Sequence, residues 1–120
     1  ISENDMSKKP VSITRKHFLD DLVTKPSAVE VNGMTMYVKP ISEVKRSSRA
    51  ASAMDDEGNF KREYLERRRV YAIIDHVCDE DGNPLFTEKD IKQLLQLDSN
   101  KLDAFYVAVA QFAEEGMGNE

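Results

Sequence analysis

Two short stretches of alternating apolar and polar residues stand out in the N-terminal third of the chain. Residues 28–31 read AVEV, residues 34–38 read MTMYV, and Asn32-Gly33 separates them. Alternation with a period of two is typical of a strand with one buried face, and Asn-Gly favours a two-residue hairpin turn. The pattern predicts a β-hairpin over residues 28–39. One face of it should rest on helices or on a partner strand, with candidates Val29, Val31, Met36 and Val38.

Elsewhere the apolar residues recur near the helical period of 3.6, and start signals precede several of the segments. Thr87 with Asp90 three residues later resembles a capping box, and Gly116 is a typical helix end. The helix over residues 43–54 is rich in alanine and serine, which gives it a weak core face. The predicted helices are 15–23 after Thr14, 43–54 after Ser42, 60–78, 88–97 after Thr87, and 102–115 after Asp98 or Ser99.

These elements define a mainly α protein. At 120 residues the chain has the length of one domain. The expected architecture is a small helical domain of about four to five helices, spanning residues 7–116, with one β-hairpin near its N-terminal third. We expect residues 1–6 to be a disordered remnant of expression, since Met6 resembles a natural start, and residues 117–120 to form a flexible tail.

Charge and composition narrow the function classes. The chain carries 22 acidic and 17 basic residues, for a net charge of −5, which argues against general nucleic-acid affinity. Cys78 is the single cysteine and cannot form an internal disulfide. Neither a secretory signal nor a run of about 20 apolar residues is present, so we expect a cytoplasmic, reduced protein.

The stretch DEDGNPLFTEKD, residues 79–90, resembles a calcium-binding loop. It places acidic or amide residues where such a loop has ligands, but Pro84 stands where the loop needs glycine, and Asp90 is shorter than the usual final glutamate. The alternative is a simple turn, in which Leu85 and Phe86 plug the core and Thr87 begins the next helix. We favour the turn and expect no metal site.

Basic residues cluster at residues 45–49 and 67–69 and suit contacts with phosphate. Acidic residues lie nearby at helical spacings, so intrahelical ion pairs of the second cluster with Glu63, Glu66 and Asp75 are the favoured interpretation. An acidic protein partner is the better functional alternative.

Patterns typical of enzymes are missing from the sequence. His76 and Cys78 are two residues apart and would point to different faces of a helix, so we interpret Cys78 as a core residue. The sequence has no glycine-rich phosphate loop and no GxSxG motif. We expect no catalytic residues and no cofactor. The methionines of the hairpin are interpreted as ordinary packing residues, although adaptable thioethers also suit variable partners.

The order of elements in VNGMTMYVKPISEVKRSSR (31–49) and from GNFKREYLERRR to AQFAEEG (58–116) resembles the tail assembly chaperones of bacteriophages with long, non-contractile tails. The resemblance covers roughly residues 7–116 and rests on a hairpin, a basic helix, an Asp-x-Asp-Gly turn and two closing helices. It implies a non-enzymatic protein of the host cytoplasm, absent from the mature virion, that coats the tape measure protein until tail tube subunits displace it. It also implies a longer, frameshifted form that recruits the tube protein.

A chaperone of this kind needs an apolar surface for its client and several copies along a long client, so we expect a homo-oligomer. The candidate partner-binding residues are Phe105, Val109 and Phe112 of the last helix, supported by Phe18 and Leu22. The alternative is that all five are core. Two other functions stay open: a small structural protein of the tail or head-joining region of the virion, and a calcium-responsive regulator.

Overall fold

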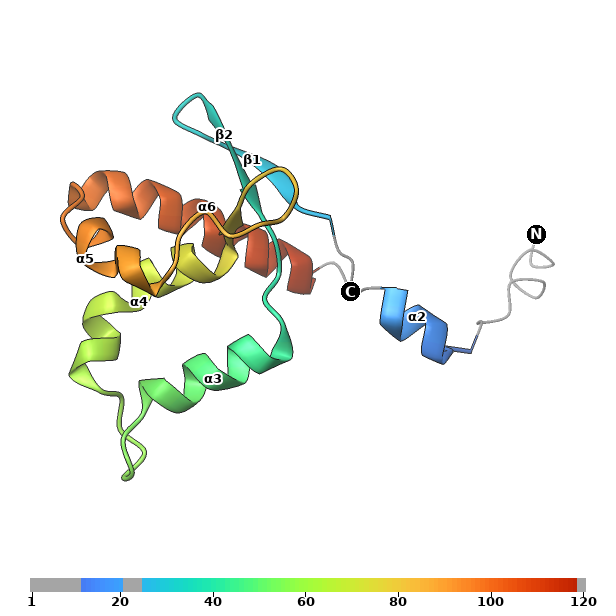
Figure 1. The fold of residues 1–120 in the computed structure, drawn as a ribbon, viewed down its shortest axis with the longest axis horizontal. Coiled ribbons are helices and arrows are strands. Elements are labelled where there is room, and N and C mark those ends of the chain that lie inside the picture. Colours follow the sequence, from blue (N-terminus) through green and yellow to red (C-terminus); the bar gives the residue numbers. More distant parts are fainter. Residues whose placement is uncertain (1–11, 21–24, 119–120) are drawn as a thin grey trace.

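The computed structural model describes residues 12–20 and 25–118 and shows a mainly α protein with a small sheet (Figure 1). This confirms the predicted fold class. The predicted remnant at residues 1–6 lies outside the described residues. The elements are α2 (Arg15–Asp20), β1 (Ser27–Val31), β2 (Met34–Val38), α3 (Glu43–Ala53), α4 (Arg62–His76), β3 (Val77–Cys78), the 3-10 helix η2 (Glu88–Asp90), α5 (Ile91–Leu94) and α6 (Ser99–Gly118).

The predicted hairpin is confirmed. β1 and β2 pair antiparallel with Val31 opposite Met34, and Asn32 and Gly33 both have positive φ, at 52° and 82°. These angles are those of a tight two-residue turn, for which Asn-Gly is the preferred sequence. Val31 and Val38 are buried, and Val29 and Met36 are partly buried against the core, so all four candidates for the inner face lie there.

A third strand, which the sequence analysis did not predict, completes the sheet. β3 pairs antiparallel with β2, with Tyr37 opposite Cys78 and Val38 opposite Val77. The predicted helix over residues 60–78 therefore ends two residues early, at His76. Pairing with β2 gives the buried backbone of Val77 and Cys78 its hydrogen-bond partners and overrides the helical periodicity.

The core lies where α4, α6 and the sheet meet. α4 packs against α6, and α6 also contacts β1. The fully buried side chains Val38, Val70 and Val109 come one from each of these three units. Cys78 is buried as well, which confirms its interpretation as a core residue.

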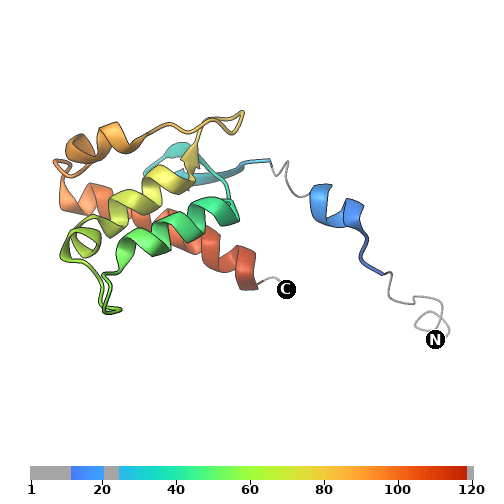
Figure 2. The same cartoon turned by 60° about the horizontal axis from the view of Figure 1, so that its bottom comes forward.

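The helix α3 lies against α4 on the outside of the molecule (Figure 2). Its start is as predicted, because the Ser42 side chain accepts a hydrogen bond from the Lys45 backbone N–H at 3.2 Å. Only Ala53 of this helix is buried, which confirms the weak core face. Side-chain ion pairs supply much of its attachment to the rest of the fold.

The last two helices begin at the predicted caps but differ in length. Thr87 and Asp90 form the predicted capping box, after which η2 leads into an α5 of only four residues, because the chain turns at residues 95–97. Asp98 caps α6 by accepting the N–H of Asn100 at 2.8 Å. α6 continues past the predicted end at Gly116 to Gly118. Among the described residues, no helix combines the length and apolar character needed to cross a membrane.

Candidate protein-binding groove

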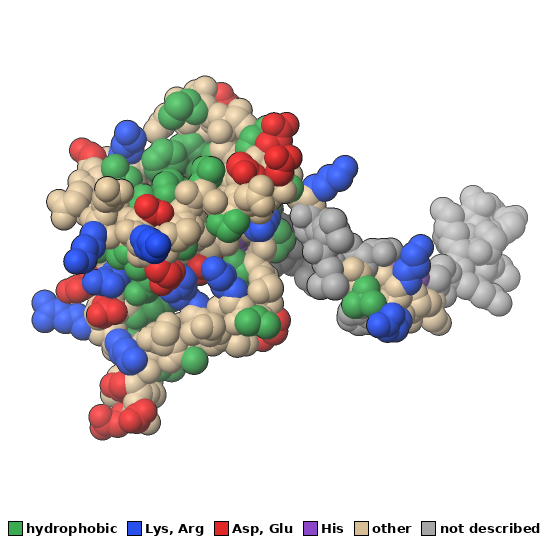
Figure 3. Space-filling model, viewed as in Figure 1, with side chains coloured by type: hydrophobic (Ala, Val, Ile, Leu, Met, Phe, Trp, Pro, Cys, Tyr) green, Lys and Arg blue, Asp and Glu red, His purple; other side chains and the backbone are tan. Residues whose placement is uncertain are grey.

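An apolar groove of about 420 Å³ opens beneath the hairpin. Its walls come from the hairpin, β3, the loop after β3, α5 and the first half of α6. The floor is made of buried core residues, among them Ile73, Val77 and Leu94. Figure 3 shows hydrophobic side chains gathered below the hairpin, with a group of acidic side chains at one side.

Two apolar side chains at the rim of the groove are exposed to solvent. Met34 at the hairpin turn is 61% exposed, and Leu85 in the loop after β3 is 53% exposed. Phe86 and Phe105 line the groove and are partly buried against the core. An apolar depression with exposed apolar edges is the type of surface that binds another protein's apolar side chains.

The loop that carries Leu85 and Phe86 is held by the acidic turn at residues 79–83. Asp79 Oδ1 accepts the N–H groups of Asp81 and Asn83, each at 2.9 Å, and Gly82 takes a φ of 91°. The Lys39 ammonium group donates a hydrogen bond to the carbonyl of Gly82 and so ties the turn to the end of β2. The turn therefore fixes one wall of the groove.

These hydrogen bonds give the first aspartate of the calcium-loop-like stretch a structural role. The Asp79 carboxylate accepts backbone N–H groups, chiefly that of Asn83, and this lowers its pKa. In the described part of the chain, no group of three or more His, Cys, Asp or Glu side chains is placed to hold a metal ion. The carboxylate that starts the motif is used to form the turn.

The prediction that Leu85 and Phe86 both plug the core was wrong for Leu85. Phe86 is partly buried and packs against the core cluster, whereas Leu85 points outward at the groove rim. Successive side chains of an extended segment point to opposite sides, so Phe86 faces the interior and Leu85 faces solvent.

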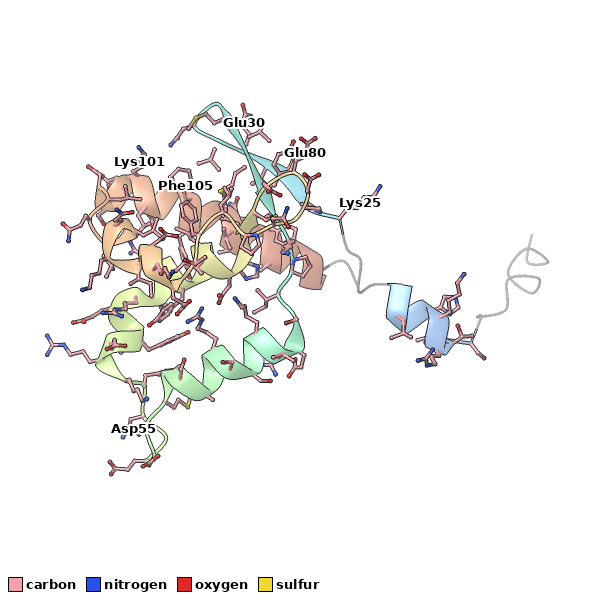
Figure 4. The ribbon with its side chains drawn as sticks, viewed as in Figure 1. Lys25, Glu30, Asp55, Glu80, Lys101 and Phe105 are labelled. Carbon is pink, nitrogen blue, oxygen red and sulfur yellow. The ribbon has the colours of Figure 1, made fainter. Side chains whose placement is uncertain are left out.

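The structure separates the predicted partner-binding residues. Phe105 lines the groove, and Figure 4 shows it on α6 below the hairpin, with Glu80 on the loop at the other side. Val109 is only 2% exposed, and Phe112 is partly buried against the core. Phe18 belongs to α2, but its side chain lies outside the described part, as does all of Leu22.

Sequence reasoning missed the groove residues Met34, Leu85 and Phe86 as a surface. Met34 was interpreted as a packing residue, and Leu85 as core. The available signals were the position of Met34 next to an Asn-Gly turn and an apolar pair directly after a polar turn. Both signals mark apolar side chains at element ends, where burial is incomplete.

The basic clusters are paired with acidic side chains, partly as predicted. Arg67 pairs with Glu63 on α4 at 3.7 Å, but Glu66 pairs with Arg62 at 3.0 Å instead of with the triplet. Asp75 was wrongly assigned to the triplet. It binds Arg49 of α3, because packing brings α3 beside the last turn of α4.

Arg49 joins three elements. Its guanidinium contacts both carboxylate oxygens of Asp75, at 2.7 and 3.0 Å, binds Glu88 at 3.2 Å, and stacks 4.1 Å from the Tyr71 ring centroid. The hydrogen bonds to Asp75 raise the pKa of Arg49 above its usual value. The basic residues of the 45–49 cluster thus form ion pairs within the fold: Lys45 and Arg49 with Asp75, and Arg46 with Glu43.

The groove, the helical scaffold and the paired charges together describe a small helical protein with one apolar candidate binding surface. A model of the family described as phage tail assembly chaperone, TAC, matches residues 7–113. The chain thus belongs to the phage tail assembly chaperones, as the resemblance implied. No curated protein matches the chain, and no solved structure does.

Proposed function

We propose that this chaperone binds the tape measure protein through the apolar groove beneath the hairpin and shields it until the tail tube assembles. The observation that carries the proposal is the groove itself, a depression of about 420 Å³ with exposed Met34 and Leu85 at its rim. Apolar side chains of a long helical client fit such a surface. Of the five predicted partner-binding residues, Phe105 lines the groove and would contact the client there.

Non-enzymatic shielding of a long client requires many weak contacts. A groove of this size accepts only a few side chains, so each copy covers a short segment of the client. Self-association of the chaperone along the client raises the total affinity without new contacts. We therefore propose that the working form is a homo-oligomer in the cytoplasm of the infected host.

The weak contact of each chaperone copy with the client also allows the chaperone to be released. Tail tube subunits that bind the tape measure protein more tightly displace individual chaperone copies one by one. A longer, frameshifted form would bring the tube protein to the complex. Phe18, Leu22, Val109 and Phe112 stay predicted contacts, and for buried Val109 contact with a client requires local opening of α6.

Co-expression with the tape measure protein of the same phage genome tests the client. We expect the wild-type protein to keep the tape measure protein soluble and to co-purify with it. The double variant Met34→Ser, Leu85→Ser removes two exposed apolar groups from the rim and should lower recovery about tenfold or more. Val44→Ser is the matched control, because Val44 is 80% exposed on α3 and does not line the groove.

Each outcome decides a different point. Equal recovery with the groove variant would reject the groove as the site, and failure of the wild-type protein to bind would reject the client. Mass spectrometry of purified virions tests displacement, and we expect the protein to be absent. Its presence in stoichiometric amount would favour the alternative function, a structural component of the virion.

A further inference from the structure

Residues 8–25 carry a net charge opposite in sign to that of residues 26–120. Residues 8–25 hold five basic and two acidic residues, whereas residues 26–120 hold 12 basic and 18 acidic residues. Charge asymmetry of this kind points to an electrostatic contact between the two parts, either within one chain or between copies.

This segment includes a short helix, α2, that stands apart from the folded body. Figures 1 and 2 both show α2 separated from the other elements. Ile13, just before the helix, is 71% exposed, and Leu19 is 39% exposed. Arg15 and Lys16 lie between them in the sequence and are also exposed. Apolar and basic side chains are thus presented together on one short element.

The groove has the complementary chemistry. Among the residues that the structure describes, Asp79 and Glu80 are the charged residues that line it, and no described lysine or arginine does. Backbone hydrogen bonds, chiefly from Asn83, lower the pKa of the Asp79 carboxyl. Asp81, next in the chain, adds a third carboxylate to the same turn. A short segment with exposed apolar side chains beside basic ones matches both the apolar floor and this acidic edge.

The place where the N-terminal segment joins the rest of the fold, at Pro26, favours docking on another copy over docking on the same copy. Pro26 lies against the acidic turn, since a Cβ built on Gly82 would be 3.6 Å from its ring. In Figure 4 Lys25 extends outward from this point, and α2 lies farther out on the same side, away from Phe105. Only five residues, 21–25, separate the end of α2 from Pro26 in the sequence. A short connection of this kind favours exchange between copies.

We propose that α2 of one copy docks in the apolar groove of a second copy, with Ile13 and Leu19 on the apolar walls and Arg15 and Lys16 toward Asp79 and Glu80. The contact is head-to-tail, so a row of copies keeps one free helix at one end and one free groove at the other, and further copies add there. The inference rests on the groove of the proposed function and names what covers it before the client arrives. A client segment competes with α2 for a groove, and copies whose α2 stays docked remain joined along the client.

Complementation between two variants tests this contact in the full-length protein without any client. The helix variant is Ile13→Asp, Leu19→Asp, and the groove variant is Met34→Asp, Leu85→Asp. All four side chains are exposed, so both variants should fold, which circular dichroism verifies. In analytical ultracentrifugation we expect wild-type protein to form concentration-dependent oligomers and each variant alone to be monomeric. An equal mixture should form dimers and nothing larger, because it offers one intact helix and one intact groove.

Charge reversal supplies an independent readout. Arg15→Glu with Lys16→Glu should weaken self-association at least tenfold, and adding Glu80→Lys with Asp81→Lys should restore it. Wild-type association should also weaken as salt concentration rises. Lack of rescue, together with failure of the mixed variants to pair, would overturn the contact.

Other occupants of the groove give different results. A wild-type monomer that becomes more extended in the helix variant would show that α2 folds into its own groove, and would reject exchange between copies. Self-association that survives both variants would place the interface elsewhere. If the helix variant still binds the tape measure protein while self-association is unaffected by it, the inference fails and the proposed function stands.

Discussion

At the scale of single residues, position at the end of an element decides whether an apolar side chain serves the core or the surface. Leu85 and Phe86 are adjacent and both apolar, yet Leu85 is 53% exposed and Phe86 packs against the core cluster. The sequence identified the turn before them but could not separate their roles, because the direction of each side chain depends on how the 79–83 turn is anchored to β2.

The pair gives a prediction about stability. Phe86→Ala should lower the free energy of unfolding by about 2 kcal/mol, less than for a fully buried phenylalanine, because part of the ring already faces the groove. Leu85→Ala should cost less than about 1 kcal/mol. Urea denaturation followed by circular dichroism measures both, and equal losses for the two variants would contradict the assignment.

A second residue-scale prediction concerns pH. Hydrogen bonds from Arg46 first, and then from Ser47, lower the pKa of Glu43 to about 2. Because the pKa is lower in the folded than in the unfolded state, the contribution of Glu43 to stability is present above the unfolded value of 4.5. It is lost as pH falls toward 2. Carboxyl NMR titration should show this depressed pKa, and Arg46→Ala should return it toward 4.5. A wild-type value near 4.5 would show that the pair does not form in solution.

At the scale of elements, α3 differs from the others in what holds it. The other long helices, α4 and α6, pack by apolar side chains, whereas α3 buries only Ala53 and is tied to α4 by the Arg49–Asp75 pair. The Asp75 side chain is only 5% exposed and lies 2.7 Å from Arg49, so removing Arg49 leaves a nearly buried carboxylate without its main partner. The sequence indicated a weak helix but assigned Asp75 to the wrong partner, because spacing within one helix says nothing about a neighbouring helix.

Arg49→Ala therefore should loosen α3 selectively. The free energy of unfolding should fall by about 2 to 3 kcal/mol, because a buried carboxylate loses its partner while Lys45 remains 3.7 Å away. Hydrogen exchange followed by mass spectrometry should speed up in α3 more than in α4 or α6. Arg46→Ala, which removes an exposed pair within α3, is the control and should leave exchange in the rest of the fold unchanged. Uniform acceleration across the protein would show that α3 is part of the central cooperative unit.

At the scale of the whole molecule, the groove is a surface that folding leaves incomplete. The sheet, α5 and α6 meet around a depression that no side chain of the described residues fills. Exposed apolar surface of this kind is a cost for a protein that works alone and a requirement for one that binds others. Membership in the tail assembly chaperones supplies a reason for keeping it.

This surface should bind an apolar dye in the native state at protein concentrations low enough to leave the groove free of a second copy. We expect the fluorescence of 8-anilinonaphthalene-1-sulfonate to increase when native protein is added. In the Met34→Ser, Leu85→Ser variant this increase should be smaller by roughly half or more. Val44→Ser should leave the signal unchanged. A signal that is equally strong in the groove variant would show that the dye binds another surface. Addition of the tape measure protein should displace the dye.

The sequence by itself determined the features that depend on neighbouring residues. The hairpin follows from alternation and Asn-Gly, the starts of α3 and α6 from Ser42 and Asp98, and the capping box from Thr87 and Asp90. Each of these rests on hydrogen bonds or dihedral preferences that span only a few residues. The tertiary structure alone decided the third strand, the partner of Asp75, the split between Leu85 and Phe86, and the groove. These depend on which segments distant in sequence meet, because burial and pairing are settled only when α4, α6 and the hairpin pack together.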